Sequence, residues 1–261
     1  MLKIIYFFVG LYILVCILLY FFQTRLIFFP EKLSQDQVLH FEGDFEERYF
    51  QVDENKTIHA LHFYNKNPKG VILYFHGNAG SLKDWGHVAP DFVKLGYDVL
   101  ISDFRGYGKS TGEISEQGFY DDAQMLYDFL LTKYQSDKII IYGRSLGTGV
   151  AVDLASKNNS QQLILETPFM NFADLAQSKF KIFPVKLLLQ YHFESDKKIR
   201  KVDCPIHIFH GTQDELIPYQ HALELASLLN KETALTTIPN GNHNNLPTHS
   251  IYWDKLKLLL K

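Results

Sequence analysis

The sequence predicts an α/β fold in which a mostly parallel central sheet of about eight strands is flanked by helices. Short apolar runs alternate along the chain with helical patterns, which is typical of strand–helix–strand units and a doubly wound sheet. The runs at residues 71–75 and 139–141 consist of Val, Ile, Leu, Tyr and Phe only, as expected of strands buried on both faces. The chain has 261 residues, of which 46% are hydrophobic and 21% charged. That composition is sufficient for a full core and excludes an intrinsically disordered chain.

The chain begins with an apolar segment of membrane-spanning length. Residues 4–22 contain no charge, and at a rise of ~1.5 Å per residue they extend roughly 28 Å, close to the hydrocarbon thickness of a bilayer. We expect residues 1–29 to form a single-pass membrane anchor and juxtamembrane segment. A cleaved signal peptide is disfavoured, since no small-residue cleavage site follows, and a buried core helix is disfavoured at a chain terminus. Lys3 and the amino terminus on one side nearly balance Arg25 and Lys32 on the other, so the positive-inside rule assigns no orientation.

Residues 30–261 are expected to form one folded domain after a polar connection at 31–47. Strands are predicted at 48–52, 57–64, 71–75, 98–102, 138–142, 162–166, 205–210 and 233–239. Helices are predicted at 82–95, 116–133, 146–157, 219–229 and 250–260. The first two strands have no helix between them and should form an antiparallel edge. Residues 169–202 lack a strand pattern, which indicates an insertion that caps one face of the domain.

Several classes of function are excluded by composition. The net charge is −3, so the chain lacks the basic surface that nucleic acids require. Cys16 and Cys204 have no paired spacing, which excludes cysteine-based zinc sites and a disulfide scaffold. The Gly-Lys-Ser at residues 108–110 is not a phosphate-binding loop, because Asp103 stands where that motif requires glycine. No metal-binding motif is present, and no metal or cofactor is expected.

Residues 143–147, Gly-Arg-Ser-Leu-Gly, lie between a predicted strand and a predicted helix. This G-x-S-x-G pattern is typical of a nucleophile elbow, whose tight turn places the serine in a strained backbone region and lifts its hydroxyl clear of the sheet. The dipole at the start of the following helix favours negative charge at the same point. We therefore predict Ser145 as a nucleophile; the alternative is a serine that only caps the helix.

A serine nucleophile needs a base that is held by an acid, and in this architecture they follow in the order Ser, Asp/Glu, His. Asp214 follows the predicted strand at 205–210, and Glu215 is its nearest rival. His243 follows the last predicted strand, whereas His249 lies at the entry to the terminal helix. We predict Asp214 as the acid and His243 as the base.

An oxyanion hole in such a site uses two backbone N–H groups. One follows the nucleophile, at Leu146, and the other is expected from the loop at 76–80, at Asn78. The glycines of that loop allow the amides to turn inward, while His76 is interpreted as bracing the loop rather than as catalytic. Asp103 and Arg105 are expected to brace loops near the nucleophile.

Together these motifs resemble the α/β-hydrolase superfamily over nearly the whole chain. The resemblance rests on residues 76–80, 103–108, 143–147, 211–218 and 241–244. With the anchor and residues 26–30, the chain is similar to membrane-anchored serine hydrolases of the depalmitoylase and esterase-like group. The resemblance implies that Ser145, Asp214 and His243 form a triad and that Asn78 and Leu146 supply oxyanion amides. Asn78 departs from the His-Gly-Gly-Gly pattern of many lipases.

The expected activity is a serine hydrolase that cleaves acyl ester or thioester bonds through an acyl-enzyme intermediate, without a cofactor. The superfamily includes esterases, lipases, acyl-protein thioesterases and peptidases, so the substrate is a small molecule, a lipid or an acylated protein. The alternatives are an aminopeptidase-like amide hydrolase and a catalytically idle scaffold. In the insertion, Phe180, Ile182, Phe183 and residues 187–189 are candidates either for an acyl pocket or for helix packing.

Overall fold

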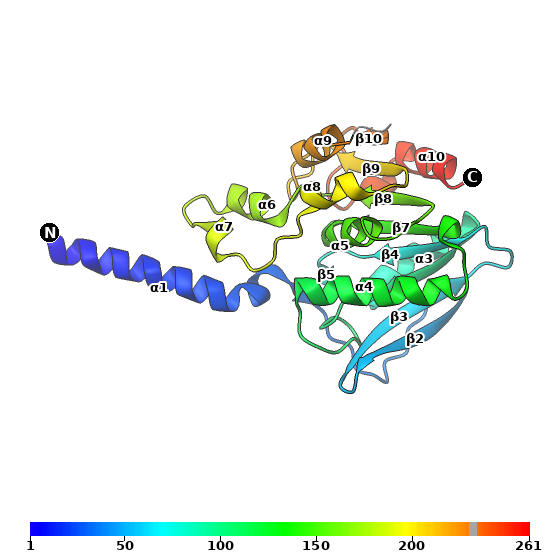
Figure 1. Ribbon diagram of the computed structural model, residues 1–261, viewed down its shortest axis with the longest axis horizontal. Coiled ribbons are helices and arrows are strands. Elements are labelled where there is room, and N and C mark those ends of the chain that lie inside the picture. Colours follow the sequence, from blue (N-terminus) through cyan, green and yellow to red (C-terminus); the bar gives the residue numbers. More distant parts are fainter. Residues whose placement is uncertain (230–233) are drawn as a thin grey trace.

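The computed structural model describes residues 1–229 and 234–261 and contains a central eight-stranded sheet with helices on both faces (Figure 1). Its strands are β2 (Asp44–Asp53), β3 (Lys56–Tyr64), β4 (Val71–Phe75), β6 (Asp98–Ser102), β7 (Ile139–Arg144), β8 (Gln162–Glu166), β9 (Ile206–Gly211) and β10 (Ala234–Ile238). They lie in the order β10-β9-β8-β7-β4-β6-β3-β2. A separate two-stranded pair joins β1 (Phe29–Pro30) to β5 (Ala79–Gly80).

The sheet is parallel from β10 to β6, and β3 and β2 add antiparallel strands at one edge. The expected antiparallel edge is therefore confirmed. Strand β4 lies between β6 and β7. The chain therefore passes from β4 to β6 on one side of it and then returns to β7 on the other side. At such a switch point the loops that leave the carboxyl ends of the strands diverge and leave a crevice. The loops that follow β4 and β7 meet there, since Phe75 pairs with Gly143.

Helices cover both faces of the sheet. They are α2 (Leu82–Trp85), α3 (Ala89–Lys94), α4 (Glu116–Leu131), α5 (Leu146–Ala155), α6 (Phe172–Lys179), α7 (Val185–Leu188), α8 (Ser195–Lys198), α9 (Gln220–Ser227) and α10 (Ser250–Leu259). One core lies between the sheet and α4, α5 and α9, and the other between the sheet and α2, α3 and α10. Both faces are buried, which explains why the central strands are apolar throughout.

The structure differs from the sequence prediction in a few places. The helix expected at 82–95 is broken, because a 3-10 turn at Gly86–Val88 separates α2 from α3. Pro90 lies at the start of α3, and a proline inside a continuous helix would remove a hydrogen bond and clash with the preceding turn. The polar connection expected at 31–47 ends earlier, since β2 begins at Asp44. Thr233, the expected first residue of the last strand, lies outside the described residues.

The N-terminal helix α1 (Leu2–Ile27) extends away from the sheet (Figure 1). It is the one helix among the described residues that is long and apolar enough to cross a membrane, and the apolar window that meets this test has a mean hydropathy of 2.7 and none of its residues buried. It is thus not a buried core helix of this chain. In the insertion, Phe180, Ile182 and Leu187 are exposed rather than packed.

Helix α5 packs unusually close to the strands beneath it, and two glycines make this possible. A Cβ atom on Gly147 would lie 2.1 Å from the carbonyl oxygen of Phe75 in β4. A Cβ atom on Gly143 would lie 2.5 Å from the carbonyl oxygen of Gly147. Both obstacles are backbone atoms that cannot move aside locally, so any side chain at these positions would push α5 off the sheet.

We expect Gly147→Ala to destabilise the domain by about 1–3 kcal/mol or more, because overpacking against backbone forces the elements apart. Thermal unfolding of the full chain in detergent measures the effect. Gly10→Ala is the control, since nothing lies within 4 Å of a Cβ atom built there. An unchanged melting temperature for Gly147→Ala would contradict this account of the α5 packing.

Candidate active site

The turn between β7 and α5 holds Ser145 in a strained conformation. Its φ is 52° and its ψ is −116°, a backbone region that residues other than glycine rarely occupy. The residue is held there by its surroundings, because its N–H donates to the carbonyl oxygen of Glu166 and its own carbonyl accepts from Thr148 Oγ1 at 2.6 Å. The strained turn predicted for residues 143–147 is therefore present, and it places Ser145, whose exposure is only 7%, at the carboxyl edge of the sheet.

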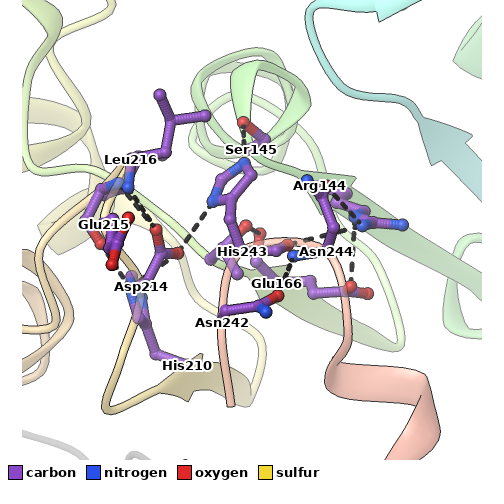
Figure 2. A network of polar contacts seen from close by, with 12 residues as sticks. Arg144, Ser145, Glu166, His210, Asp214, Glu215, Leu216, Asn242, His243 and Asn244 are labelled. Atoms are coloured by element: carbon purple, nitrogen blue, oxygen red, sulfur yellow. Dashed lines mark hydrogen bonds and ion pairs between the residues drawn. The ribbon is translucent and has the colours of Figure 1, made fainter.

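The structure brings the three predicted side chains together from three distant loops (Figure 2). His243, after β10, has its Nε2 atom 2.9 Å from Ser145 Oγ. Its Nδ1 atom is 2.8 Å from Oδ2 of Asp214, which follows β9. Because an ionised carboxylate only accepts hydrogen bonds, Nδ1 is the protonated nitrogen and Nε2 is free to accept a proton from the serine.

The Asp214 carboxylate is held by several donors. Its Oδ1 atom accepts the backbone N–H groups of Leu216 and Ile217 at 2.9 and 2.8 Å, and His210 Nε2 lies 3.4 Å from Oδ2. Burial raises the pKa of Asp214, but the hydrogen bonds from His210, His243 and Ile217 outweigh it and hold the pKa well below its usual range. The group therefore remains a carboxylate at neutral pH and keeps His243 in one orientation.

The loop after β4 lies beside Ser145, where the second oxyanion donor is expected. A Cβ atom on Gly77 would lie 3.7 Å from Cβ of Ser145, so this backbone runs directly past the serine. Leu146 is the first residue of α5, where the helix leaves its N–H groups free. The Asn78 side chain is engaged elsewhere, because its Nδ2 donates to the Ile27 carbonyl at 2.5 Å and its Oδ1 accepts from Tyr107 at 3.0 Å. Only the Asn78 backbone is thus offered to a ligand.

Among the described residues, the histidine and acidic side chains considered as alternatives to the predicted triad form no hydrogen bond with Ser145. His76 is fully buried and its Nδ1 atom is 2.7 Å from the Gly77 carbonyl oxygen, as expected of a loop brace. Glu215 is exposed, and His249 is the N-cap residue of α10. Within residues 1–229 and 234–261 no three His, Cys, Asp or Glu side chains are grouped to hold a metal ion.

Asp103 and Arg105 also brace loops, in different ways. Asp103 accepts the N–H of Leu82 at 3.0 Å through Oδ1 and lies 3.7 Å from His76, so it connects its own loop to the loop after β4. Arg105 instead forms two hydrogen bonds to Asp122 of α4, at 2.8 and 2.7 Å. Asp103 is therefore the one that supports the region next to Ser145.

A buried charged pair beneath the site was not anticipated from the sequence. Arg144 Nε lies 3.2 Å from Glu166 Oε1, and the hydroxyls of Tyr142 and Tyr252 donate to Glu166 Oε2 at 2.6 and 2.9 Å. Arg144 also reaches the His243 loop, where its Nη2 atom is 3.5 Å from the His243 carbonyl oxygen. The sequence signal that could have indicated this pair is a charged residue at the end of each of two apolar strands, Arg144 in β7 and Glu166 in β8.

The aromatic neighbour of Arg144 completes this arrangement. Its guanidinium carbon lies 5.0 Å from the centre of the Trp85 ring, within the range of a cation–π contact. Trp85 Nε1 in turn donates to the carbonyl oxygen of Ala79 at 2.7 Å. Arg144 therefore connects the nucleophile turn, the His243 loop and the loop after β4.

Comparisons with known proteins are consistent across sequence and structure. A family model described as "Serine aminopeptidase, S33" matches residues 66–194. The chain is 31% identical over 199 residues to the alpha/beta hydrolase domain-containing protein aho-3 of Caenorhabditis elegans, covering 73% of this chain and 57% of that protein. It is 32% identical over 197 residues to the alpha/beta hydrolase domain-containing protein 17B of Xenopus tropicalis, covering 73% and 66%. The matched region thus spans less than two thirds of these relatives.

Among solved structures, the esterase Pf2001 of Pyrococcus furiosus is similar with a TM-score of 0.67. The alignment covers 88% of this chain and 98% of the esterase, at 18% sequence identity. At that identity the match concerns the fold.

We expect Arg144→Met to destabilise the protein by about 3–5 kcal/mol, because it leaves Glu166 buried without a counter-charge. Adding Glu166→Gln should recover much of that loss, since the remaining side chain is neutral. Chemical denaturation of the single and double variants measures both effects. Lys83→Met removes the exposed ion pair with Glu31 and should cost about 0–1 kcal/mol. Equal losses of stability for Arg144→Met and Lys83→Met would refute the role given to the buried pair.

Proposed function

The chain belongs to the α/β-hydrolase superfamily, and from that premise we propose that it is a serine hydrolase that cleaves acyl ester or thioester bonds. The observation that carries the proposal is the continuous contact from Ser145 Oγ through His243 to Asp214, at 2.9 and 2.8 Å. These contacts are the geometry that a hydroxyl needs to become a nucleophile at neutral pH.

The reaction follows from the arrangement of these atoms. Ser145 Oγ attacks the acyl carbonyl carbon while His243 Nε2 takes the hydroxyl proton, and the oxyanion lies against the N–H groups of Leu146 and Asn78. The C–O or C–S bond then breaks, and the imidazolium returns the proton to the leaving alcohol or thiol. Water, deprotonated by His243, attacks the acyl-enzyme and releases the carboxylic acid and Ser145. Asp214 stabilises the imidazolium in both halves of the reaction.

Ester or thioester cleavage is favoured over the aminopeptidase alternative by the electrostatics of the site. An aminopeptidase needs a free acidic group to hold the substrate amine. Near the nucleophile, Asp214 is committed to His243 and Glu166 is committed to Arg144. The name of the matching family model therefore does not decide the bond that is cleaved. An idle scaffold is disfavoured because all three triad positions are filled and in contact.

We also propose that α1 anchors the enzyme to a membrane. It is exposed over its apolar length, and in water that surface would be strongly unfavourable. It also continues into the domain, because the Ile27 carbonyl accepts a hydrogen bond from Asn78. This connection favours a retained anchor over a leader that is removed. A membrane location raises the local concentration of substrates with long acyl chains, such as lipids and acylated proteins.

A fluorophosphonate probe should label the wild-type protein and fail to label Ser145→Ala, because the probe reacts with an activated serine. Hydrolysis by Ser145→Ala should fall by about 10⁴-fold or more. Ser227→Ala, which removes an exposed hydroxyl on α9, is the matched control and should label normally. The nucleophile assignment fails if the wild-type protein is not labelled or if Ser145→Ala labels equally.

A panel of substrates that share one acyl chain but differ in linkage tests the class of bond. We expect esters and thioesters to be hydrolysed faster than the matching amide, because the buried carboxylates nearest Ser145, those of Asp214 and Glu166, are already paired with His243 and Arg144. Steady-state kcat/KM for each linkage, with Ser145→Ala as the background, measures the preference. Fastest turnover of the amide would transfer the proposal to the aminopeptidase alternative.

A further inference from the structure

We propose that residues 180–188 form a second membrane-contacting segment, which enters the hydrocarbon of the leaflet next to the catalytic domain and lies against α1 there. This cap segment includes α7 and the loop before it. In Figure 1 it lies beside the half of α1 that is nearer to the domain. The inference rests on the proposed role of α1 as a membrane anchor and assigns the bilayer as the partner of a surface otherwise exposed to water.

The cap segment is bonded to α1 at two levels. Near the middle of α1, the Tyr12 hydroxyl donates to the Ile182 carbonyl at 2.8 Å, and the Tyr12 ring stacks on Phe183 with centroids 5.9 Å apart. Near its end, Gln23 Nε2 donates to the Leu188 carbonyl at 3.0 Å. Gln23 is buried, unlike the rest of α1. From residue 12 to residue 23 the helix rises ~16 Å, so the segment follows α1 over that length.

The position of Tyr12 along α1 determines how deep in the bilayer the cap segment lies. It lies one residue from the midpoint of the uncharged run at 4–22, and ~15 Å along the helix from the end of that run. A hydrocarbon core is about 30 Å thick, and an average tilt of about 20° changes depth along a helix only slightly. If α1 crosses the bilayer, a loop bonded to Tyr12 cannot remain in water and must lie within the leaflet.

The side chains of the cap segment suit that environment. Phe180, Ile182 and Leu187 are 59%, 76% and 80% exposed, a high exposure for three large apolar residues in so short a stretch. The Lys186 ammonium pairs with Asp174 at 2.6 Å. Lys181 has a long flexible side chain whose stem is apolar and whose charge can be directed towards the leaflet surface.

Much of the backbone of the cap segment is hydrogen-bonded within the protein, which lowers the cost of entering the hydrocarbon. The N–H groups of residues 180, 183, 185, 187, 188 and 189 donate to carbonyls of residues 176–185. Gln177 adds two bonds, accepting from the Val185 N–H at 3.1 Å and donating to the Phe183 carbonyl at 3.2 Å. Gln23 Oε1 accepts the N–H of Gln190 at 2.8 Å. An ordinary surface loop has water for these groups and does not need such bonds.

Both membrane elements are tied to loops of the active site. Lys179, just before the cap segment, donates to the carbonyl oxygen of Glu215 at 2.7 Å, next to Asp214. Ile27, at the end of α1, accepts from Asn78 of the oxyanion loop. Entry of the cap segment into the leaflet would therefore hold the mouth of the site close to the source of acyl chains.

Tryptophan quenching by brominated lipids tests the inference directly. The chain has two tryptophans, Trp85 and Trp253, both in the catalytic domain. Full-length Ile182→Trp and Leu187→Trp proteins are reconstituted into phosphatidylcholine vesicles, with or without bromine on the acyl chains. We expect the added fluorescence of both variants to be largely lost in the brominated vesicles, because bromine quenches only tryptophans within the hydrocarbon.

Two further variants make each outcome decisive. Leu18→Trp, on α1, should be quenched, whereas Leu258→Trp, 56% exposed on α10 at the opposite end of the domain (Figure 1), should not. If Leu18→Trp is quenched but Ile182→Trp and Leu187→Trp are not, the anchor stands and the cap inference is overturned. If Leu18→Trp is not quenched, both the membrane anchor and the cap inference are overturned. Circular dichroism verifies folding, and the readout is independent of catalysis, so loss of hydrolase activity would not mimic either result.

Discussion

The close approach of α5 to β4 and β7 is the constraint on which the site depends. Gly143 and Gly147 let the backbone of α5 lie directly against β4 and β7, and Ser145, in the turn between β7 and α5, has a strained backbone conformation. The same turn aims the N-terminus of α5 at the Ser145 side chain. A single packing requirement therefore presents the proposed nucleophile, strains its backbone and orients a helix dipole that favours negative charge beside it.

The buried polar groups beneath this turn fix the relative positions of the loops. Asp214 is held by backbone N–H groups of its own loop, which makes its orientation independent of a substrate. Arg144 extends from the nucleophile turn to Glu166, to the His243 loop and to Trp85. Such a network is unfavourable to bury unless every member is paired. The contacts of Arg144 with three separate loops indicate that this charged pair fixes the placement of those loops.

The N-terminal helix is part of the domain's architecture as well as a candidate anchor. Its last turn is bonded to the oxyanion loop through Asn78, and its middle is bonded to the cap through Tyr12. These contacts give the catalytic loops a defined position relative to α1. In a tethered enzyme with a flexible linker, by contrast, the active site would sample many orientations above the bilayer. This bonded connection suits the proposed cleavage of substrates taken from the membrane.

Local patterns in the sequence were sufficient to predict the eight strands, the antiparallel edge, the strained turn at Ser145 and the order in which Ser145, Asp214 and His243 follow their strands. They were sufficient because strand burial and turn glycines are properties of neighbouring residues. The break between α2 and α3, the Arg144–Glu166 pair and the contact of Tyr12 with the cap were decided only by the tertiary structure. Each joins groups whose proximity depends on how whole elements pack, as Tyr12 and Ile182 are 170 residues apart in the chain, and no periodicity encodes such a contact.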